Sequence, residues 1–207
     1  MKFIKFSYCI ILSINFSCSA QVVNNTITHN QAIDSLKIYF YEFSLNNDTS
    51  YIIKANDLIK NLDVTNKSRY NSLITNFKLQ VNFILNKYDD SLLLLDSLRS
   101  RNVYEVEEFE FMECYFSLKK YKANGDKVRF EIIFSKYIEK IINILSDNAT
   151  QYERQILSIR YYFLLYDEFQ SRGKFDNAKN LLVNKFSKLK NIIDEEVIQY
   201  SKAPNKN

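Results

Sequence analysis

The sequence has very few residues of the kinds that build turns. Among its 207 residues there are two glycines, Gly125 and Gly173, and one proline, Pro204. β-Hairpins and sandwiches need frequent Gly, Pro or Asn turns, and phosphate-binding loops need closely spaced glycines. A chain this poor in both residues must place most of its positions inside helices joined by short connections. We therefore predict an all-α protein without a dinucleotide or nucleotide fingerprint.

Histidine and cysteine are also scarce, which removes several kinds of active site. His29 is the only histidine, so a His-based triad or a multi-His metal site is excluded by number. Cys114 has no histidine near it in the sequence, and a buried, inert thiol is the favoured interpretation. We expect no catalytic residues, no cofactor and no bound metal, and hence no enzyme.

One acidic cluster is the strongest feature that argues against that expectation. Five glutamates fall within nine residues, at Glu105, Glu107, Glu108, Glu110 and Glu113. Such a cluster would bind a divalent cation or a basic partner if its carboxylates converged. Helical spacing distributes them over two faces, and acidic residues early in a helix also suit its dipole. A solvated face is the favoured reading.

The charge balance argues against a nucleic-acid partner. The formal net charge is +4, and without residues 1–20 it becomes 26 − 24 = +2. A dedicated nucleic-acid binder normally carries a concentrated basic surface. Lysines do gather late in the chain, but their spacing scatters them around a helix, and we expect a solvated face from Lys174, Lys179, Lys185, Lys188 and Lys190.

Residues 1–20 have the form of a secretory signal. Two lysines precede an apolar run of about 11 residues, which is too short to span a bilayer, and small residues follow it. The style of this leader resembles those of Bacteroidetes proteins. Cleavage before Gln21 is the favoured outcome and predicts a periplasmic or secreted protein. Lipidation of Cys18 is the alternative, in which the protein is tethered to a membrane, although Asn15 stands where a lipobox has an aliphatic residue.

The rest of the chain divides into a polar segment at 21–28, a helical domain at 29–200 and a polar tail at 201–207. Apolar residues recur at helical spacing in eight stretches of the domain. Capping boxes are expected at 28–31 and 150–153, and Asp89 is expected to cap the fourth helix. The last predicted helix carries its apolar stripe from Ala178 to Ile193. Eight amphipathic helices with short turns pair most simply as four antiparallel hairpins.

Two segments resemble the middle of a tetratricopeptide repeat. Residues 86–98 and 173–182 each join an aromatic–acidic turn (Tyr88-Asp89, Phe175-Asp176) to a small residue early in the next helix. In that resemblance the small residue, Ser91 or Ala178, allows the two helices to approach closely. Related turns lie at Asn47 and Gly125, so four turns begin 39, 39 and 48 residues apart. The resemblance implies a right-handed α-solenoid of about four hairpins, and a compact helical bundle is the alternative.

The chain departs from the repeat family in several positions. The first helices have no Trp, and Leu79 and Tyr166 stand where the family has glycine. No proline closes a repeat, because Val103 and Lys190 occupy those positions. The resemblance is therefore to a degenerate form of the repeat.

In an array of this kind the first helix of each hairpin lines the concave side. The polar residues there are the candidate partner contacts, namely Asn76, Gln80, Arg160, Asp167 and Gln170. We expect an exported, non-enzymatic module that binds a protein or peptide. An immunity protein against a periplasmic toxin is one specific version. The alternative is a structural or assembly factor of the cell envelope, anchored through Cys18.

Overall fold

A computed structural model of the chain describes residues 24–62, 71–99, 104, 106–147 and 149–201. These residues form nine α-helices and one short 3-10 helix, and no strand occurs among them. The predicted all-α class is confirmed. The chain separates into two compact units, residues 1–120 (unit 1) and residues 121–207 (unit 2), with the boundary in the last turn of α6.

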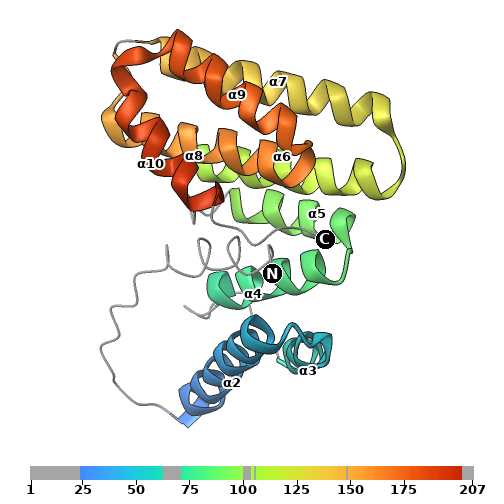
Figure 1. The fold of residues 1–207 in the computed structure, drawn as a ribbon. Helices are drawn as coiled ribbons and strands as arrows, with labels where there is room; N and C mark the ends of the chain where they lie inside the picture. Colours follow the sequence, from blue (N-terminus) through green and yellow to red (C-terminus); the bar gives the residue numbers. More distant parts are fainter. Residues whose placement is uncertain (1–23, 63–70, 100–103, 105, 148, 202–207) are drawn as a thin grey trace. The chain divides into compact units, whose positions relative to one another are not determined.

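In unit 1 each helix packs on the next one along the chain. The helix α2 contacts α3, α3 contacts α4, and α4 contacts α5, while aromatic rings join α4 to α6. Figure 1 draws α2 and α3 in blue to teal, and α4 and α5 in green. The bounds are Asn24–Asn46 for α2, Thr49–Lys60 for α3, Asn71–Ile84 for α4, Tyr88–Arg99 for α5 and Val106–Ala123 for α6.

Unit 2 follows the same sequential pattern until its last helix. The helix α7 contacts α8, and α8 contacts α9, but α10 contacts both α8 and α9. These helices run from yellow to red in Figure 1. Their bounds are Lys127–Ser146 for α7, Tyr152–Phe169 for α8, Arg172–Lys185 for α9, Ser187–Leu189 for the 3-10 helix η1 and Lys190–Ser201 for α10. Sequential packing of neighbours is compatible with both a solenoid and a bundle.

Three of the four predicted turns share one backbone conformation. Asn47, Asn86 and Gly125 have φ angles of 53°, 60° and 70°, and each lies just after the end of a helix. The left-handed conformation lets the chain reverse while amide groups satisfy the last carbonyls. At Asn86, the Lys87 amide donates to the Asn82 carbonyl at 2.8 Å, and at Gly125 the Asp126 amide donates to the Tyr121 carbonyl at 2.9 Å. The regular 39-residue interval thus reflects equivalent helix ends.

The fourth predicted turn is wrong in its position. Gly173 lies inside α9 and does not have a positive φ. The chain turns instead at Gln170 and Ser171, and the Ser171 hydroxyl accepts a hydrogen bond from the Lys174 amide at 3.4 Å. A serine N-cap therefore begins the helix close to the position where a glycine turn was expected.

The predicted helix starts need three corrections. The helix α2 begins at Asn24, so residues 28–31 lie within its early turns and part of the expected polar segment is helical. The helix α8 begins after Gln151, which makes no capping hydrogen bond through its side chain, so the capping box at 150–153 is not formed. Asp89 lies in the first turn of α5 and does not cap it. Each error arises because several neighbouring residues have suitable capping side chains.

The last predicted helix is broken in the structure. Phe186 leaves the helical conformation at φ −125° and ψ 56°, and its amide donates to the Leu182 carbonyl to close α9. The 3-10 helix η1 and α10 follow. Phe186 packs against the core of unit 2. A turn here lets α10 fold back onto α8, which a continuous helix could not do.

Each unit has its own apolar core. In unit 1, Phe83 of α4 stacks on Phe116 of α6 with ring centroids 4.5 Å apart, and Phe40 of α2 contacts Phe77. In unit 2, Phe163 of α8 contacts Phe175 of α9 at 5.4 Å. Each large ring buries more apolar area than an aliphatic side chain, and burial of apolar area is the main term that stabilises each unit.

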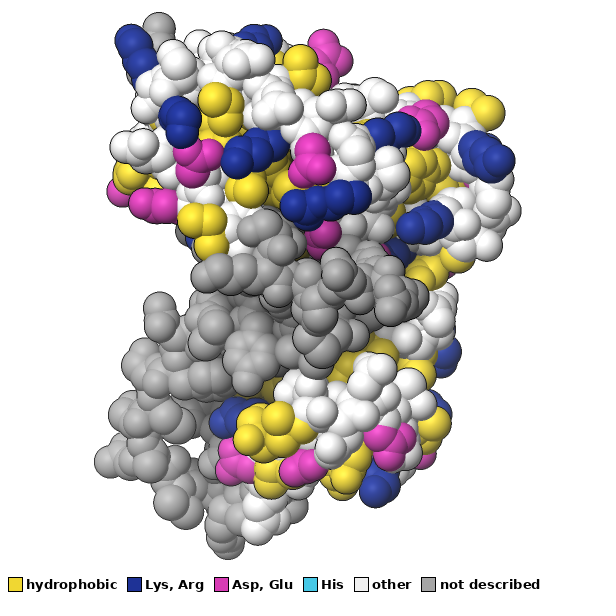
Figure 2. Space-filling model, viewed as in Figure 1, with side chains coloured by type: hydrophobic (Ala, Val, Ile, Leu, Met, Phe, Trp, Pro, Cys, Tyr) yellow, Lys and Arg dark blue, Asp and Glu magenta, His cyan; other side chains and the backbone are white. Residues whose placement is uncertain are grey.

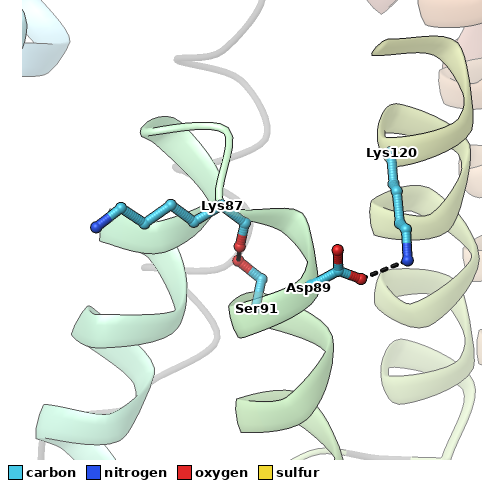
Figure 3. A network of polar contacts seen from close by, with 4 residues as sticks. All are labelled: Lys87, Asp89, Ser91 and Lys120. Carbon is cyan, nitrogen blue, oxygen red and sulfur yellow. Dashed lines mark hydrogen bonds and ion pairs between the residues drawn. The ribbon is translucent and has the colours of Figure 1, made fainter. Parts of the chain in front are cut away.

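The two small residues of the repeat resemblance are buried between their helices. Ser91 and Ala178 are both almost fully inaccessible. The Ser91 hydroxyl donates to the Lys87 carbonyl at 3.1 Å, within its own helix α5 (Figure 3). Nearby, Asp89 of α5 forms an ion pair with Lys120 of α6. A larger side chain at Ser91 would push α5 away from α4.

Candidate functional site

The helix α4 buries polar side chains that were expected at a partner surface. Asn76, Gln80 and Asn82 are each at most 6% exposed, and apolar residues of the same helix are buried around them. Lys78 is exposed. The helix contacts α3 on one side and α5 on another, so few directions remain for solvent. In this structure a partner docking on the surface does not reach Asn76 or Gln80.

Asn76 is held by a tyrosine that lies 28 positions later. The Tyr104 hydroxyl donates a hydrogen bond to the Asn76 side-chain oxygen. Burial raises the pKa of Tyr104 well above its usual value, and the charge of Glu108 adds to that effect. The phenol therefore stays protonated and able to donate at every physiological pH. This pair ties α4 to the segment that precedes α6.

Gln80 lies one helical turn after Asn76 and is less well satisfied. Among the described residues, its side-chain oxygen is the one buried side-chain polar atom without a hydrogen-bond partner. Leaving such an acceptor unpaired costs about 1–3 kcal/mol relative to a satisfied one. The sequence gives no sign of this difference between Asn76 and Gln80, since both are amides on one helical face.

On α8, Arg160 makes a two-pronged contact with Glu196 of α10. The guanidinium donates at 2.9 Å and 3.3 Å to the two carboxylate oxygens. Glu196 is only 5% exposed, whereas the side chain of Arg160 is 38% exposed. A fork of this geometry is the strongest form of ion pair in proteins. The predicted contact residue Arg160 is therefore engaged within its own chain.

The two other predicted residues lie at the end of α8. Gln170 is the C-cap of the helix and is half-buried, and its side-chain oxygen accepts a hydrogen bond from Lys174 at 2.9 Å. Asp167 is also half-buried, and it interacts with the surrounding protein. The structure thus places Arg160 and Asp167 on α8 and Gln170 at its C-cap, in a different unit from Asn76 and Gln80.

Sequence reasoning missed an apolar stripe on α2. Ile38, Tyr41 and Leu45 are 58%, 55% and 62% exposed, at spacings of three and four residues that place them on one face. The opposite face, with Leu36, Phe40 and Phe43, is buried in the core of unit 1. The signal was present in the sequence, because α2 has apolar residues on two sides and only one of them can face α3.

The remaining candidates for chemistry have structural surroundings. Burial raises the pKa of the Cys114 thiol to about 12, with a smaller contribution from the charge of Glu113. Glu113 itself forms an ion pair with Arg99 of α5 at 2.8 Å. No group of three metal-ligating side chains occurs among the residues that the structure describes. Glu105, the His29 side chain and Cys18 lie outside the described residues and side chains.

The surface of unit 2 carries charges of both signs. On the face seen in Figure 2, blue basic, magenta acidic and yellow hydrophobic side chains alternate over the upper part of the view. Four lysines of the late cluster are exposed and Lys179 is half-exposed, where it pairs with Asp194 at 3.4 Å. A mixed surface of this kind has no extended field of one sign.

Comparison with other proteins leaves the family open. The chain matches no model of a known protein family, no curated protein and no solved structure. None of the helices described has the length and apolar character that crossing a membrane requires. The tetratricopeptide resemblance therefore rests on the chain's own hairpins and on their turns.

Proposed function

We propose that the protein is an exported, non-enzymatic module that binds a protein partner through its helical-hairpin surface. The observation that carries this proposal is the exposed stripe of Ile38, Tyr41 and Leu45 on α2. Single exposed apolar residues are ordinary on a protein surface. Three of them on one face of a helix whose other face is already buried mark a surface that is covered in use.

The sequential helical hairpins support this interpretation. Arrays of such hairpins need a polar outer face on a terminal element to remain soluble. The first described helix, α2, differs, because Ile38, Tyr41 and Leu45 are exposed on its outer face. A protein partner with a complementary apolar patch would bury the stripe. The tyrosine also offers a hydroxyl at the edge of such a contact.

The five polar residues expected at a partner surface differ in how accessible they are in the structure. Asn76 and Gln80 are buried, so a role for them requires a partner segment that enters unit 1. Arg160 and Asp167 of α8 and the C-cap residue Gln170 stay candidates for contact. A partner touching them would also meet the acidic and basic side chains of α10.

The proposed location is the periplasm or the exterior, on the basis of the signal-like residues 1–20. An immunity protein that neutralises a periplasmic toxin is the specific version we favour, and its gene would lie beside a toxin gene. The alternative, a lipid-anchored assembly factor, requires diacylglycerol on Cys18. Mass spectrometry of the mature N-terminus separates the two, since the first predicts Gln21 as the free first residue.

The test is a capture experiment from envelope extract with matched variants. The wild-type protein should retain a partner, and the double variant Ile38→Glu with Leu45→Glu should lose it because two charges then stand in the apolar contact. Leu93→Glu, at an exposed apolar position on α5, is the control and should capture normally. Equal capture by all three proteins, or no capture by the wild type, would contradict the proposal.

A further inference from the structure

The last described helix, α10, contacts two other helices of unit 2. It packs on α8 as well as on its neighbour α9, and α8 is two helices earlier in the chain (Figure 1). A helical break at Phe186 and the 3-10 helix η1 separate it from α9. The helix α10 therefore lies against both helices of the preceding hairpin.

The contact surface of α10 has the pattern of a ligand helix in a groove. Ile193 and Val197 are four residues apart and buried, and Glu196 lies on the same face. The two apolar side chains enter the core of unit 2, and the carboxylate meets the Arg160 guanidinium on α8. Beside them, Asp194 pairs with Lys179 of α9. The groove therefore supplies an apolar floor with one cation on each of two helices.

We propose that α8 and α9 form a binding groove for an acidic amphipathic helix, and that α10 occupies this groove as an internal ligand. The partner is a protein helix with two branched apolar residues four positions apart and a carboxylate immediately before the second. Charge complementarity selects it, because Arg160 and Lys179 already hold two acidic residues of α10. In the free protein α10 closes the groove, so the partner binds only as α10 leaves.

In this arrangement a partner helix binds to unit 2 only when it displaces α10. A partner helix must compete with an occupant that is covalently attached and therefore present at high effective concentration. Only a helix that reproduces the anchors and the carboxylate displaces it. The proposal concerns unit 2 and is independent of the apolar stripe on α2, so failure of either leaves the other standing.

The test uses the full chain and a fluorescent synthetic peptide with the sequence of residues 187–201 as the probe. Two variants weaken the internal helix without altering the groove. Glu196→Gln removes the carboxylate, and Val197→Ala shortens a buried anchor. Glu195→Gln is the matched control, since it makes the same chemical change at an exposed neighbouring position. Circular dichroism verifies that each chain remains helical.

We expect the peptide to bind the Glu196→Gln and Val197→Ala chains about tenfold or more tightly than the wild type, because a weaker occupant is more easily displaced. The Glu195→Gln chain should behave as the wild type does. A peptide that carries Gln in place of its own Glu196 should lose most of its affinity for every chain. If neither weakened chain binds the peptide while folded, or if Glu195→Gln binds it as tightly as they do, the proposal is overturned.

Discussion

The helices α4 and α8 hold equivalent places as first helices of hairpins, yet they treat their polar residues in different ways. On α4, Asn76 and Gln80 are neutral amides enclosed in unit 1, and one of them has an unpaired oxygen. On α8, the candidate Arg160 is charged, keeps part of its surface in solvent and is paired with Glu196. The polar side chains of α4 are enclosed by the core of unit 1, whereas Arg160 of α8 is covered in part by α10.

The difference shows which polar groups in this chain belong to the fold and which are available for binding. A buried amide bonded to a tyrosine fixes the packing of α4, and it is lost as a contact for any surface partner. A half-exposed arginine on α8 keeps its charge and changes partner when α10 moves. Substitutions on α4 and α8 should separate these two behaviours.

The largest expected effect tests what the two helices have in common. Phe83 on α4 and Phe163 on α8 are both buried and both contact rings of a neighbouring helix. Replacing either by alanine leaves a cavity and should lower the free energy of unfolding by about 3–5 kcal/mol. Chemical denaturation measures this loss in the free energy of unfolding. Tyr161→Ala, at a half-buried position of α8, should cost clearly less, and equal losses at all three positions would mean that the cores are not where we place them.

The next effect separates the two amides of α4. Asn76→Leu removes the acceptor of the Tyr104 hydroxyl and should destabilise the protein by about 1–3 kcal/mol. Gln80→Met keeps the length of the side chain and removes an oxygen that has no partner, so stability should stay level or rise by about 1 kcal/mol. Thermal unfolding of both variants decides the matter. A comparable loss in Gln80→Met would mean that its oxygen is bonded.

A smaller effect distinguishes the two glycines. Gly125 has a φ of +70°, which costs a side chain about 1–2 kcal/mol, so Gly125→Ala should be destabilising. Gly173 lies in α9 with open space around it, so Gly173→Ala should stabilise the chain by about 0.4–1 kcal/mol. Differential scanning calorimetry measures the direction of the stability change in each variant. The same sign at both positions would place the fourth turn back at Gly173.

The smallest effect uses Cys114 as a reporter on unit 1. In a chain that begins at Gln21 it is the only thiol. Because its pKa is raised to about 12, the thiolate is very scarce at pH 8, whereas an ordinary thiol has about a tenth or more of the reactive form there. Labelling at pH 8 should therefore be slow in the native protein and fast in denaturant. Rapid native labelling would show that unit 1 opens on its own.

The sequence predicted the all-α class and three of the turns because their signals are local. Asn47, Asn86 and Gly125 end helices through backbone geometry that a few residues determine. The fourth turn failed because Ser171, two positions before Gly173, caps the helix equally well. The break at Phe186 has no Gly or Pro, and it depends on a tertiary contact that the periodicity cannot reveal.

The candidate site was predictable only in part. Helical spacing does place Arg160 and Asp167 on one helix, as observed, whereas Gln170 is the C-cap just beyond it. Burial of Asn76 and Gln80 depends on how tightly neighbours surround α4, and a single helix carries no such information. Glu196 could have been noticed, because its position three residues after Ile193 places it beside the apolar stripe, where a buried carboxylate needs a cation as partner.

The most direct test of the account is hydrogen exchange of the full chain, followed by mass spectrometry of peptides from α8 and α10. If α10 is a removable occupant, its amides should exchange through a local opening and lose protection well before those of α8. Glu196→Gln should widen that gap, and Glu195→Gln should leave it unchanged. Exchange of α10 and α8 at one common rate, in the wild type and in Glu196→Gln alike, would show that α10 is a fixed part of the core.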